Sequence, residues 1–202
     1  RGRHVLLVGH SGHPEVVGTM GQLPKGSITL VEDIEQIEAL EPESRDNLAW
    51  VTQTTLSVDD THHIVEALKQ KFPKIVGPHK DDICYATTNR QEAVKQVAPL
   101  VDALIVVGSS NSSNSQRLRE VAERVGCPIT RLVNRAEDLD WEAFSDIRRL
   151  GLTAGASAPE VLVEEIIDAF APRYEVTVDT VSTTTEDMVF PLPRELRSEA
   201  AE

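Results

Sequence analysis

The chain has 202 residues and a net charge of −13 at pH 7, which argues against broad contact with nucleic acid, since that requires a basic face. No apolar run approaches the roughly 20 residues of a membrane span, so a membrane protein is not expected. The chain has two cysteines and begins as a strand rather than as an export signal, which favours a reduced, cytosolic compartment.

The first half of the sequence alternates apolar strands with helical patterns. A helix over residues 58–72 is predicted from its apolar stripe at helical spacing, with Ser57 as its cap and Pro73 as its stop. Strands are predicted at residues 4–8, 27–32, 48–53 and 74–76.

The second half repeats this alternation. Helices are predicted at residues 90–97, 116–125 and 159–169, and strands at residues 103–107, 129–133 and 150–153. Ser157 is expected to cap the last of these helices. Residues 174–181 alternate as a strand would, and residues 188–196 have the composition of an extended tail that lies on another surface.

Near-continuous apolar strands that alternate with helices indicate parallel sheets covered by helices. The predicted fold class is therefore α/β, with two small parallel-sheet units and an extended C-terminal tail. The units are expected to cover residues 1–80 and 81–171, with a join near residues 79–82, and the tail to cover residues 172–202.

In open parallel sheets ligands bind beyond the carboxyl ends of the strands, and two unusual segments of the first half follow predicted strands. In the segment 9–15, Gly-His-Ser-Gly-His-Pro-Glu, His13 and Glu15 offer a proton carrier and an anion contact two residues apart. The hydroxyl-rich segment 52–57 could bind an anion or relay a proton. Both segments also fit a plain helix start, so the two interpretations stay open here.

A third segment, residues 108–115, stands between a buried strand and a helix and reads Gly-Ser-Ser-Asn-Ser-Ser-Asn-Ser. Backbone N–H groups, hydroxyls, amides and the positive end of a helix dipole together favour an anion pocket. The segment lacks the Gly-Lys-Ser/Thr ending of a Walker loop. A fourth segment of small residues, 151–159, fits ordinary turn chemistry equally well.

Cys84 precedes a predicted helix and is surrounded by small hydroxyl and amide residues. A thiol placed there is a candidate for a lowered pKa, and so for a thiolate that binds metal or attacks a substrate. A packed, structural thiol is the alternative. Cys127 precedes Pro128 at a strand entry, away from the other motifs, and is interpreted as a packing residue.

Five segments, in this order, resemble the 4-hydroxy-3-methylbut-2-enyl diphosphate reductase family, also called LytB or IspH. They are His-Pro-Glu-Val-Val-Gly-Thr-Met-Gly-Gln at 13–22, Thr-Gln-Thr-Thr-Leu-Ser-Val-Asp-Asp-Thr at 52–61, Asp-Ile-Cys-Tyr-Ala-Thr-Thr-Asn-Arg-Gln at 82–91, Asn-Ser-Ser-Asn-Ser at 111–115 and Thr-Ala-Gly-Ala-Ser-Ala-Pro at 153–159. The resemblance covers nearly the whole chain.

The resemblance implies a fold of three similar α/β units around a central cavity that holds a [4Fe-4S] cluster. It implies reductive removal of an allylic hydroxyl from the diphosphate substrate, which yields isopentenyl and dimethylallyl diphosphate in the last step of the non-mevalonate isoprenoid pathway. It implies ferredoxin or flavodoxin as electron donor, and a location in the bacterial cytosol or, alternatively, the plastid stroma.

The resemblance also implies roles for individual residues. Cys84 would be a cluster ligand, supplied as thiolate. Glu15 would be the proton source for the leaving hydroxyl, with Thr54 as its hydrogen-bonded partner. The diphosphate or the rest of the substrate would be bound by His13, Thr55, Ser112, Ser113, Asn114 and Ser157.

One departure from the family pattern bears on activity. The family's two other cluster cysteines lie upstream of the His-Pro-Glu motif, and Cys127 matches neither. The chain is therefore expected to be the C-terminal two-thirds of such an enzyme, unable alone to hold a stable cluster and inactive. The rival functions are a non-redox module that binds diphosphate or another anion, and a transferase or hydrolase with Cys84 as nucleophile beside His13.

Overall fold

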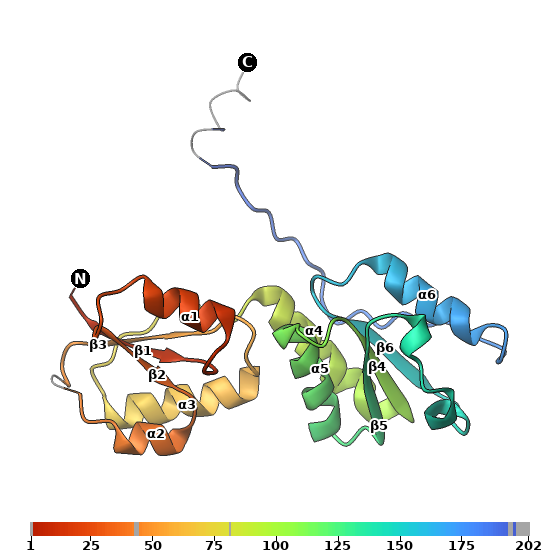
Figure 1. Cartoon of the computed structure of the whole chain (residues 1–202), viewed down its shortest axis with the longest axis horizontal. Helices are drawn as coiled ribbons and strands as arrows, with labels where there is room; N and C mark the ends of the chain where they lie inside the picture. Colours follow the sequence, from red (N-terminus) through yellow and green to blue (C-terminus); the bar gives the residue numbers. More distant parts are fainter. Residues whose placement is uncertain (1, 43–44, 81, 194–195, 197–202) are drawn as a thin grey trace.

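Two three-stranded parallel sheets, each covered by helices, form the fold in a computed structural model that describes residues 2–42, 45–80, 82–193 and 196 (Figure 1). The first sheet has the order β2-β1-β3 and is built from β1 (His4–Val8), α1 (Pro14–Gly21), β2 (Ile28–Val31), α2 (Ile34–Ala39), β3 (Leu48–Thr52) and α3 (Val58–Lys71). The second has the order β5-β4-β6 and is built from α4 (Tyr85–Val97), β4 (Ala103–Val107), α5 (Ser113–Arg124), β5 (Ile129–Val133), β6 (Leu150–Ala154) and α6 (Glu160–Phe170). Three 3₁₀ turns complete the second unit: η1 (Ala98–Leu100), η2 (Ala136–Asp138) and η3 (Trp141–Phe144). The α/β class predicted from the sequence is confirmed.

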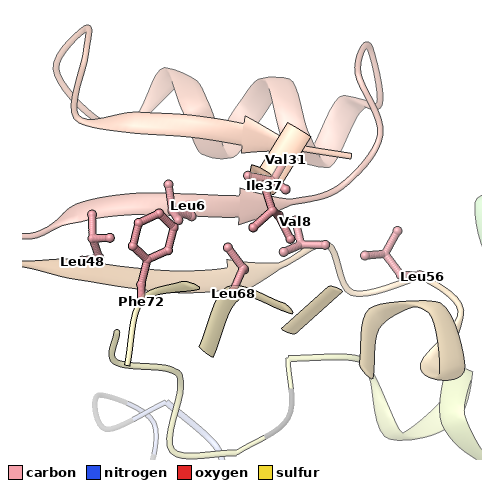
Figure 2. Close-up of a cluster of buried hydrophobic side chains, with 8 residues drawn as sticks. All are labelled: Leu6, Val8, Val31, Ile37, Leu48, Leu56, Leu68 and Phe72. Atoms are coloured by element: carbon pink, nitrogen blue, oxygen red, sulfur yellow. The ribbon is translucent and has the colours of Figure 1, made fainter. Parts of the chain in front are cut away.

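The first sheet is sandwiched between helices because successive residues of its central strand point to opposite faces. Leu6 and Val8 pack with Phe72, at the end of α3, in the cluster that Figure 2 shows between the sheet and helices α2 and α3. Leu7 points the other way and packs with Val16 of α1. Burying a large side chain of this kind stabilises the fold by roughly 1.5–3 kcal/mol.

The second sheet follows the same plan. Leu104 and Val106 of β4 pack with Leu118 on the face covered by α4 and α5. Ile105 packs with Ile166 of α6 on the opposite face. All five residues of β4 are buried, as expected for the middle strand of a parallel sheet that is covered on both faces.

The strands confirm most of the sequence predictions, and the departures have local causes. Residues 74–76 form only an isolated bridge, between Val76 and Ala49, so the fourth strand predicted in the first half is wrong. Residues 174–181 form no strand, because alternation alone supplies no neighbouring strand to pair with. The short helix α2, which Asp33 caps, was not predicted.

Helix α4 begins at Tyr85, five residues before the predicted start, so Cys84 is its N-cap and the residues directly after it are already helical. The division of the chain into units at residue 80 stays a prediction, and residue 81 lies outside the described residues.

The C-terminal segment from residue 175 to 193 has neither helix nor strand. It touches α4 where Asn89 donates to Glu186 at 2.9 Å and where the rings of Tyr85 and Phe190 lie 6.2 Å apart. Its packing on another unit stays a prediction, and residues 194–195 and 197–202 lie outside the described residues. No helix in the described part of the chain combines the length and the apolar character that a membrane crossing requires.

Candidate functional site

Each sheet has a topological switch point at the carboxyl ends of its strands, because the chain leaves the central strand toward one side and later crosses to the other. Open α/β sheets bind ligands at such a point, and we call it the crevice of that sheet. In the first sheet the loops after β1 and β3 flank this point, and in the second the loops after β4 and β6 do so. These four loops, with the helix starts that follow them, carry the sequence-predicted functional residues other than Cys84, which stands at the start of α4. Hydrogen bonds join the loop after β3 to the start of α5, so the two crevices meet.

Glu15, at the start of α1, and Thr54, after β3, form a tight pair across the first crevice. The backbone N–H of Thr54 donates to Oε1 of Glu15 at 2.9 Å, and the Thr54 hydroxyl donates to Oε2 at 3.1 Å. His13 caps the same helix, and its Nδ1 accepts from the N–H of Glu15 at 3.2 Å. The structure therefore brings together three residues that the sequence predicts to be functional, namely Glu15, Thr54 and His13.

Cys84 lies beside this pair at the N-terminus of α4. Its backbone N–H donates to the carbonyl oxygen of Thr54 at 3.0 Å, and its thiol is exposed and makes no capping hydrogen bond. The backbone of Cys84 is thus held next to Thr54, and its exposed thiol is accessible to a ligand. Cys127, by contrast, is buried in the core, where burial raises the pKa of its thiol, as expected for a packing residue.

Helix α4 is fastened to the loop after β3, which fixes where Cys84 stands. The side chain of Gln91 is fully buried, donates to the carbonyl oxygen of Leu56 at 2.8 Å and accepts from the N–H of Val58 at 3.0 Å. A carboxylate oxygen of Asp82 accepts from the N–H of Thr52 at 2.8 Å. The position of the thiol therefore depends on contacts along the whole helix.

The start of α5 carries three of the predicted binding residues. Ser112 caps the helix, and its hydroxyl accepts from the N–H and from the hydroxyl of Ser115 at 3.3 and 3.0 Å. Asn114 is 6% exposed, and neither its amide nitrogen nor its amide oxygen has a partner. A buried amide without hydrogen-bond partners costs free energy. The geometry therefore suits a bound molecule that accepts from the amide nitrogen of Asn114 and donates to its amide oxygen.

Two glycines let the start of α5 approach the ends of β4 and β6. A Cβ atom on Gly108 would lie 2.2 Å from Oγ of Ser115, and one on Gly155 would lie 2.1 Å from the same atom. The Cβ position of Gly155 is also 3.7 Å from the amide nitrogen of Asn114. Ser115, which the sequence analysis did not single out, is thus the contact that packs the two loops around α5.

Ser157 lies in the turn between β6 and α6, and its side chain is exposed. The expectation that Ser157 caps α6 is wrong, because the N-cap is Pro159 and no side chain bonds to the helix start. The N–H of Ala158 instead donates to the carbonyl oxygen of Gly155 at 3.0 Å, which turns the chain back at that glycine. The turn as a whole adjoins Asn114, whereas Ser157 itself makes no contact with the other predicted residues.

Thr55 and Ser113 join the two crevices. The hydroxyl of Thr55 lies 3.0 Å from that of Ser113, and the amide nitrogen of Gln53 lies 3.0 and 3.4 Å from these two oxygens. Gln53 is fully buried and was missed as a functional candidate. Its signal in the sequence was that it is the one amide within a row of hydroxyls directly after a strand.

A second set of contacts between the units is ionic. Arg124 of α5 donates to both carboxylate oxygens of Asp60 of α3, at 2.6 and 3.0 Å, and holds the pKa of that carboxyl below its ordinary value. Arg117 of α5 lies 2.9 Å from Nε2 of His10, in the loop after β1. The first pair joins α5 to α3, and the second joins α5 to the loop after β1.

Together these features define a class: an α/β protein with a buried, unpartnered amide at a helix start, a carboxylate paired with a hydroxyl, and an exposed thiol, all near the carboxyl ends of two parallel sheets. A family model described as LytB protein matches residues 1–171, and the chain belongs to this family. A relative from Methylocella silvestris, named 4-hydroxy-3-methylbut-2-enyl diphosphate reductase, is 72% identical over 197 residues, 98% of this chain and 62% of its own length. A relative of the same name from Beijerinckia indica is 70% identical over 200 residues, 99% of this chain and 63% of its own length.

A solved structure agrees with these relatives. The E-1-hydroxy-2-methyl-but-2-enyl-4-diphosphate reductase of Plasmodium falciparum is 34% identical and superposes with a TM-score of 0.88 over 96% of this chain, which is 61% of that protein. The chain therefore spans a little over three-fifths of the length of the proteins that it matches.

Proposed function

We propose that this chain supplies the diphosphate-binding loops and the proton donor of a 4-hydroxy-3-methylbut-2-enyl diphosphate reductase. Two supports are independent of each other: membership of the LytB family, with relatives of that name at 72% and 70% identity, and the geometry at the start of α5. The proposed reaction removes the allylic hydroxyl and yields isopentenyl and dimethylallyl diphosphate. The proposed location is the bacterial cytosol, in keeping with the bacterial relatives.

The unpartnered amide of Asn114 is the observation that carries the proposal. Its amide nitrogen can donate to a phosphate oxygen, as can the free N–H groups of the first turn of α5. The amide oxygen needs a donor, which a substrate hydroxyl would supply. A diphosphate ester with a free hydroxyl can satisfy both atoms, whereas a fully ionised anion can accept from the nitrogen only.

The remaining predicted residues have complementary tasks. Ser112 and Ser113 at the start of α5, with His13 and Thr55, would bind the diphosphate, and Ser157 would join them from its exposed turn. Glu15, once protonated, would give its proton to the departing oxygen, which leaves as water when the carbon–oxygen bond breaks. The Thr54 hydroxyl, 3.1 Å from Oε2, holds that carboxyl in place.

Reduction also requires two electrons, and the family resemblance assigns their delivery to a [4Fe-4S] cluster fed by ferredoxin or flavodoxin. Cys84 suits one ligand position, because its thiol is exposed and its backbone is held next to Thr54. The cluster needs several thiolates, and the described residues contain no group of three or more His, Cys, Asp or Glu side chains that could hold a metal. This chain's residues alone therefore do not fit the cluster, and no step is assigned to it here.

The proposal predicts that the chain alone is inactive and that it becomes active when the rest of a relative is supplied. The test is a chimera in which the chain replaces the matching part of the Methylocella silvestris relative. It is reconstituted anaerobically with iron and sulfide and assayed with dithionite and a viologen. We expect turnover by the chimera, loss of turnover with Cys84→Ser or Glu15→Gln, and retention with the matched control Cys127→Ser.

Three outcomes would contradict the proposal. Turnover by the isolated chain at the relative's rate would show that the missing ligands are not needed. An inactive chimera, in a preparation where the relative itself is active, would instead favour the non-redox anion-binding module. Activity of the chimera that survives the removal of iron would favour the cysteine nucleophile.

A further inference from the structure

Gln53, which has no role in the proposed reaction, is one of the two fully buried glutamines, and it lies where the two crevices meet. The N–H of His10 donates to its amide oxygen at 3.1 Å. A backbone N–H can only donate, so this contact fixes which end of the amide is oxygen and which is nitrogen. The amide nitrogen is therefore the end that faces Thr55 and Ser113.

The hydrogens in this cluster can be counted. The amide nitrogen of Gln53 only donates, so the hydroxyl oxygens of Thr55 and Ser113, at 3.0 and 3.4 Å, both act as acceptors toward it. The two hydroxyls lie 3.0 Å apart and share one hydrogen between them. One hydroxyl hydrogen of the pair is left over, and it has to point out of the triangle.

We propose that Gln53 is a positioning residue that presents this hydroxyl pair as a hydrogen-bond donor to the diphosphate. Because the amide nitrogen of Gln53 donates to both hydroxyl oxygens, neither hydroxyl can point its hydrogen toward Gln53. The spare hydroxyl hydrogen therefore stays directed away from Gln53, toward an anion at the start of α5. Gln53 also ties the loops after β1 and β3 to α5, which aligns the Glu15 side of the site with the Ser113 side. This inference rests on the proposed function, since it assigns a donor to the same diphosphate.

The substitution Gln53→Glu tests the proposal through pH. The introduced carboxyl, when protonated, still donates one hydrogen to the pair and still accepts from His10. Burial raises the pKa of such a carboxyl, so it ionises only as the pH rises. Once ionised it only accepts, draws the hydroxyl hydrogens inward and adds a negative charge beside the anion.

The measurement is the dissociation constant of inorganic pyrophosphate, by calorimetry on the whole chain, at several pH values. We expect the variant to bind about tenfold or more weakly than wild type near about pH 8, and the ratio of the two constants to shrink as the pH falls. The ratio cancels the titration of pyrophosphate and of the groups common to both proteins. On the elements around residue 53 these groups are His10, His13, Glu15, Glu32, Asp60, Asp82, Cys84 and Arg117.

Two further variants separate positioning from folding. Gln53→Met keeps the volume but not the donor, so its binding should weaken by a factor that does not change with pH relative to wild type. In a Ser113→Ala background, Gln53→Met should cost little more, because the residue acts through that hydroxyl. If Gln53→Glu fails to fold, this double-mutant cycle of Gln53→Met and Ser113→Ala still tests whether Gln53 acts through the Ser113 hydroxyl.

Each outcome has one meaning. If the ratio of the variant and wild-type dissociation constants is the same at every pH for Gln53→Glu, Gln53 does not have the proposed role. The same follows if the effects of Gln53→Met and Ser113→Ala are fully additive. In both cases binding of pyrophosphate by wild type still supports the proposed diphosphate site. Absence of pyrophosphate binding by wild type overturns the proposed site and this inference together.

Discussion

Replacing Gly155 with alanine should lower the free energy of unfolding, because the added methyl group collides with the start of α5. The added Cβ would lie 2.1 Å from Oγ of Ser115, far inside contact distance, and 3.4 Å from its Cβ. Gly155 does not have a positive φ, so alanine meets no backbone strain there. The effect of the substitution should therefore come from the clash with the Ser115 hydroxyl alone.

The structure gives the size of the effect. Ser115 is 1% exposed, and its hydroxyl lies 3.0 Å from that of Ser112. Turning the Ser115 side chain away breaks that hydrogen bond and leaves a buried hydroxyl unpaired, which costs about 1–3 kcal/mol. In a Ser115→Ala background the new Cβ meets the Cβ atom of residue 115 at 3.4 Å and the amide nitrogen of Asn114 at 3.7 Å, neither of which is a clash, so Gly155→Ala should change the stability by less than about 0.5 kcal/mol.

Gly108 supplies the matched control. A Cβ there would lie 2.2 Å from Oγ of Ser115 but also 2.8 Å from its Cβ, whose place is set by the backbone of α5. Rotation of the side chain cannot relieve the second contact, so the helix itself must shift. Gly108→Ala should cost about 2–3 kcal/mol or more, and Ser115→Ala should not rescue it.

The assay is urea unfolding followed by circular dichroism, with the free energy of unfolding measured for the three single variants and the two double variants. The reasoning requires strong coupling between residues 155 and 115 and weak coupling between residues 108 and 115. Equal coupling for the two pairs would refute it, as would a Gly155→Ala variant as stable as wild type.

Two other predictions concern charge and the thiols. The hydrogen bonds from Arg124 lower the folded-state pKa of Asp60, so their contribution is fully present above the unfolded pKa and is lost as the pH falls through the folded pKa. Because both side chains are about half exposed, Asp60→Asn should cost at most about 1 kcal/mol near pH 7. Urea unfolding should show the difference beginning to fall below about pH 4, the unfolded-state value, and disappearing as the pH passes below the lowered folded-state pKa. A difference that stays constant in acid would contradict the assignment. When the folded protein is treated with a thiol reagent, the exposed Cys84 should react fast and the buried Cys127 slowly. The substitution Cys84→Ser should therefore abolish the fast phase, and Cys127→Ser should not. Loss of the fast phase with Cys127→Ser would contradict the exposure of the two thiols.

Much of the fold was predictable because its strands are short apolar runs whose pattern is local. The strand predictions for residues 4–8, 103–107 and 129–133 coincide with β1, β4 and β5. Helix boundaries were less predictable, since α4 begins at Tyr85 through contacts with the loop after β3, which are distant in the sequence. The alternation of apolar and polar residues at 174–181 predicted a strand that the structure does not contain, because a strand needs a neighbouring strand that no local pattern reveals.

The candidate site divides in the same way. Residue types and position drew attention to Glu15, to Cys84 and to the segment 108–115, because reactive and anion-binding side chains are recognisable by their chemistry and by their place near strand ends and helix starts. The resemblance to the LytB family was needed to select Asn114 within that segment. Sequence could not reveal that Gln53 faces Ser113, since these residues are 60 positions apart and belong to different sheets.

By itself, then, the sequence determined the α/β class, the loops that carry the chemistry and the family to which they are similar, because these follow from local composition and order. Only the tertiary structure decided which groups meet. It paired Glu15 with Thr54, left the amide of Asn114 buried without a partner, and bound the backbone of Cys84 to Thr54. The reason is physical: hydrogen-bond partners and burial are set by how loops and helices that are far apart in the sequence pack together, which no single segment encodes.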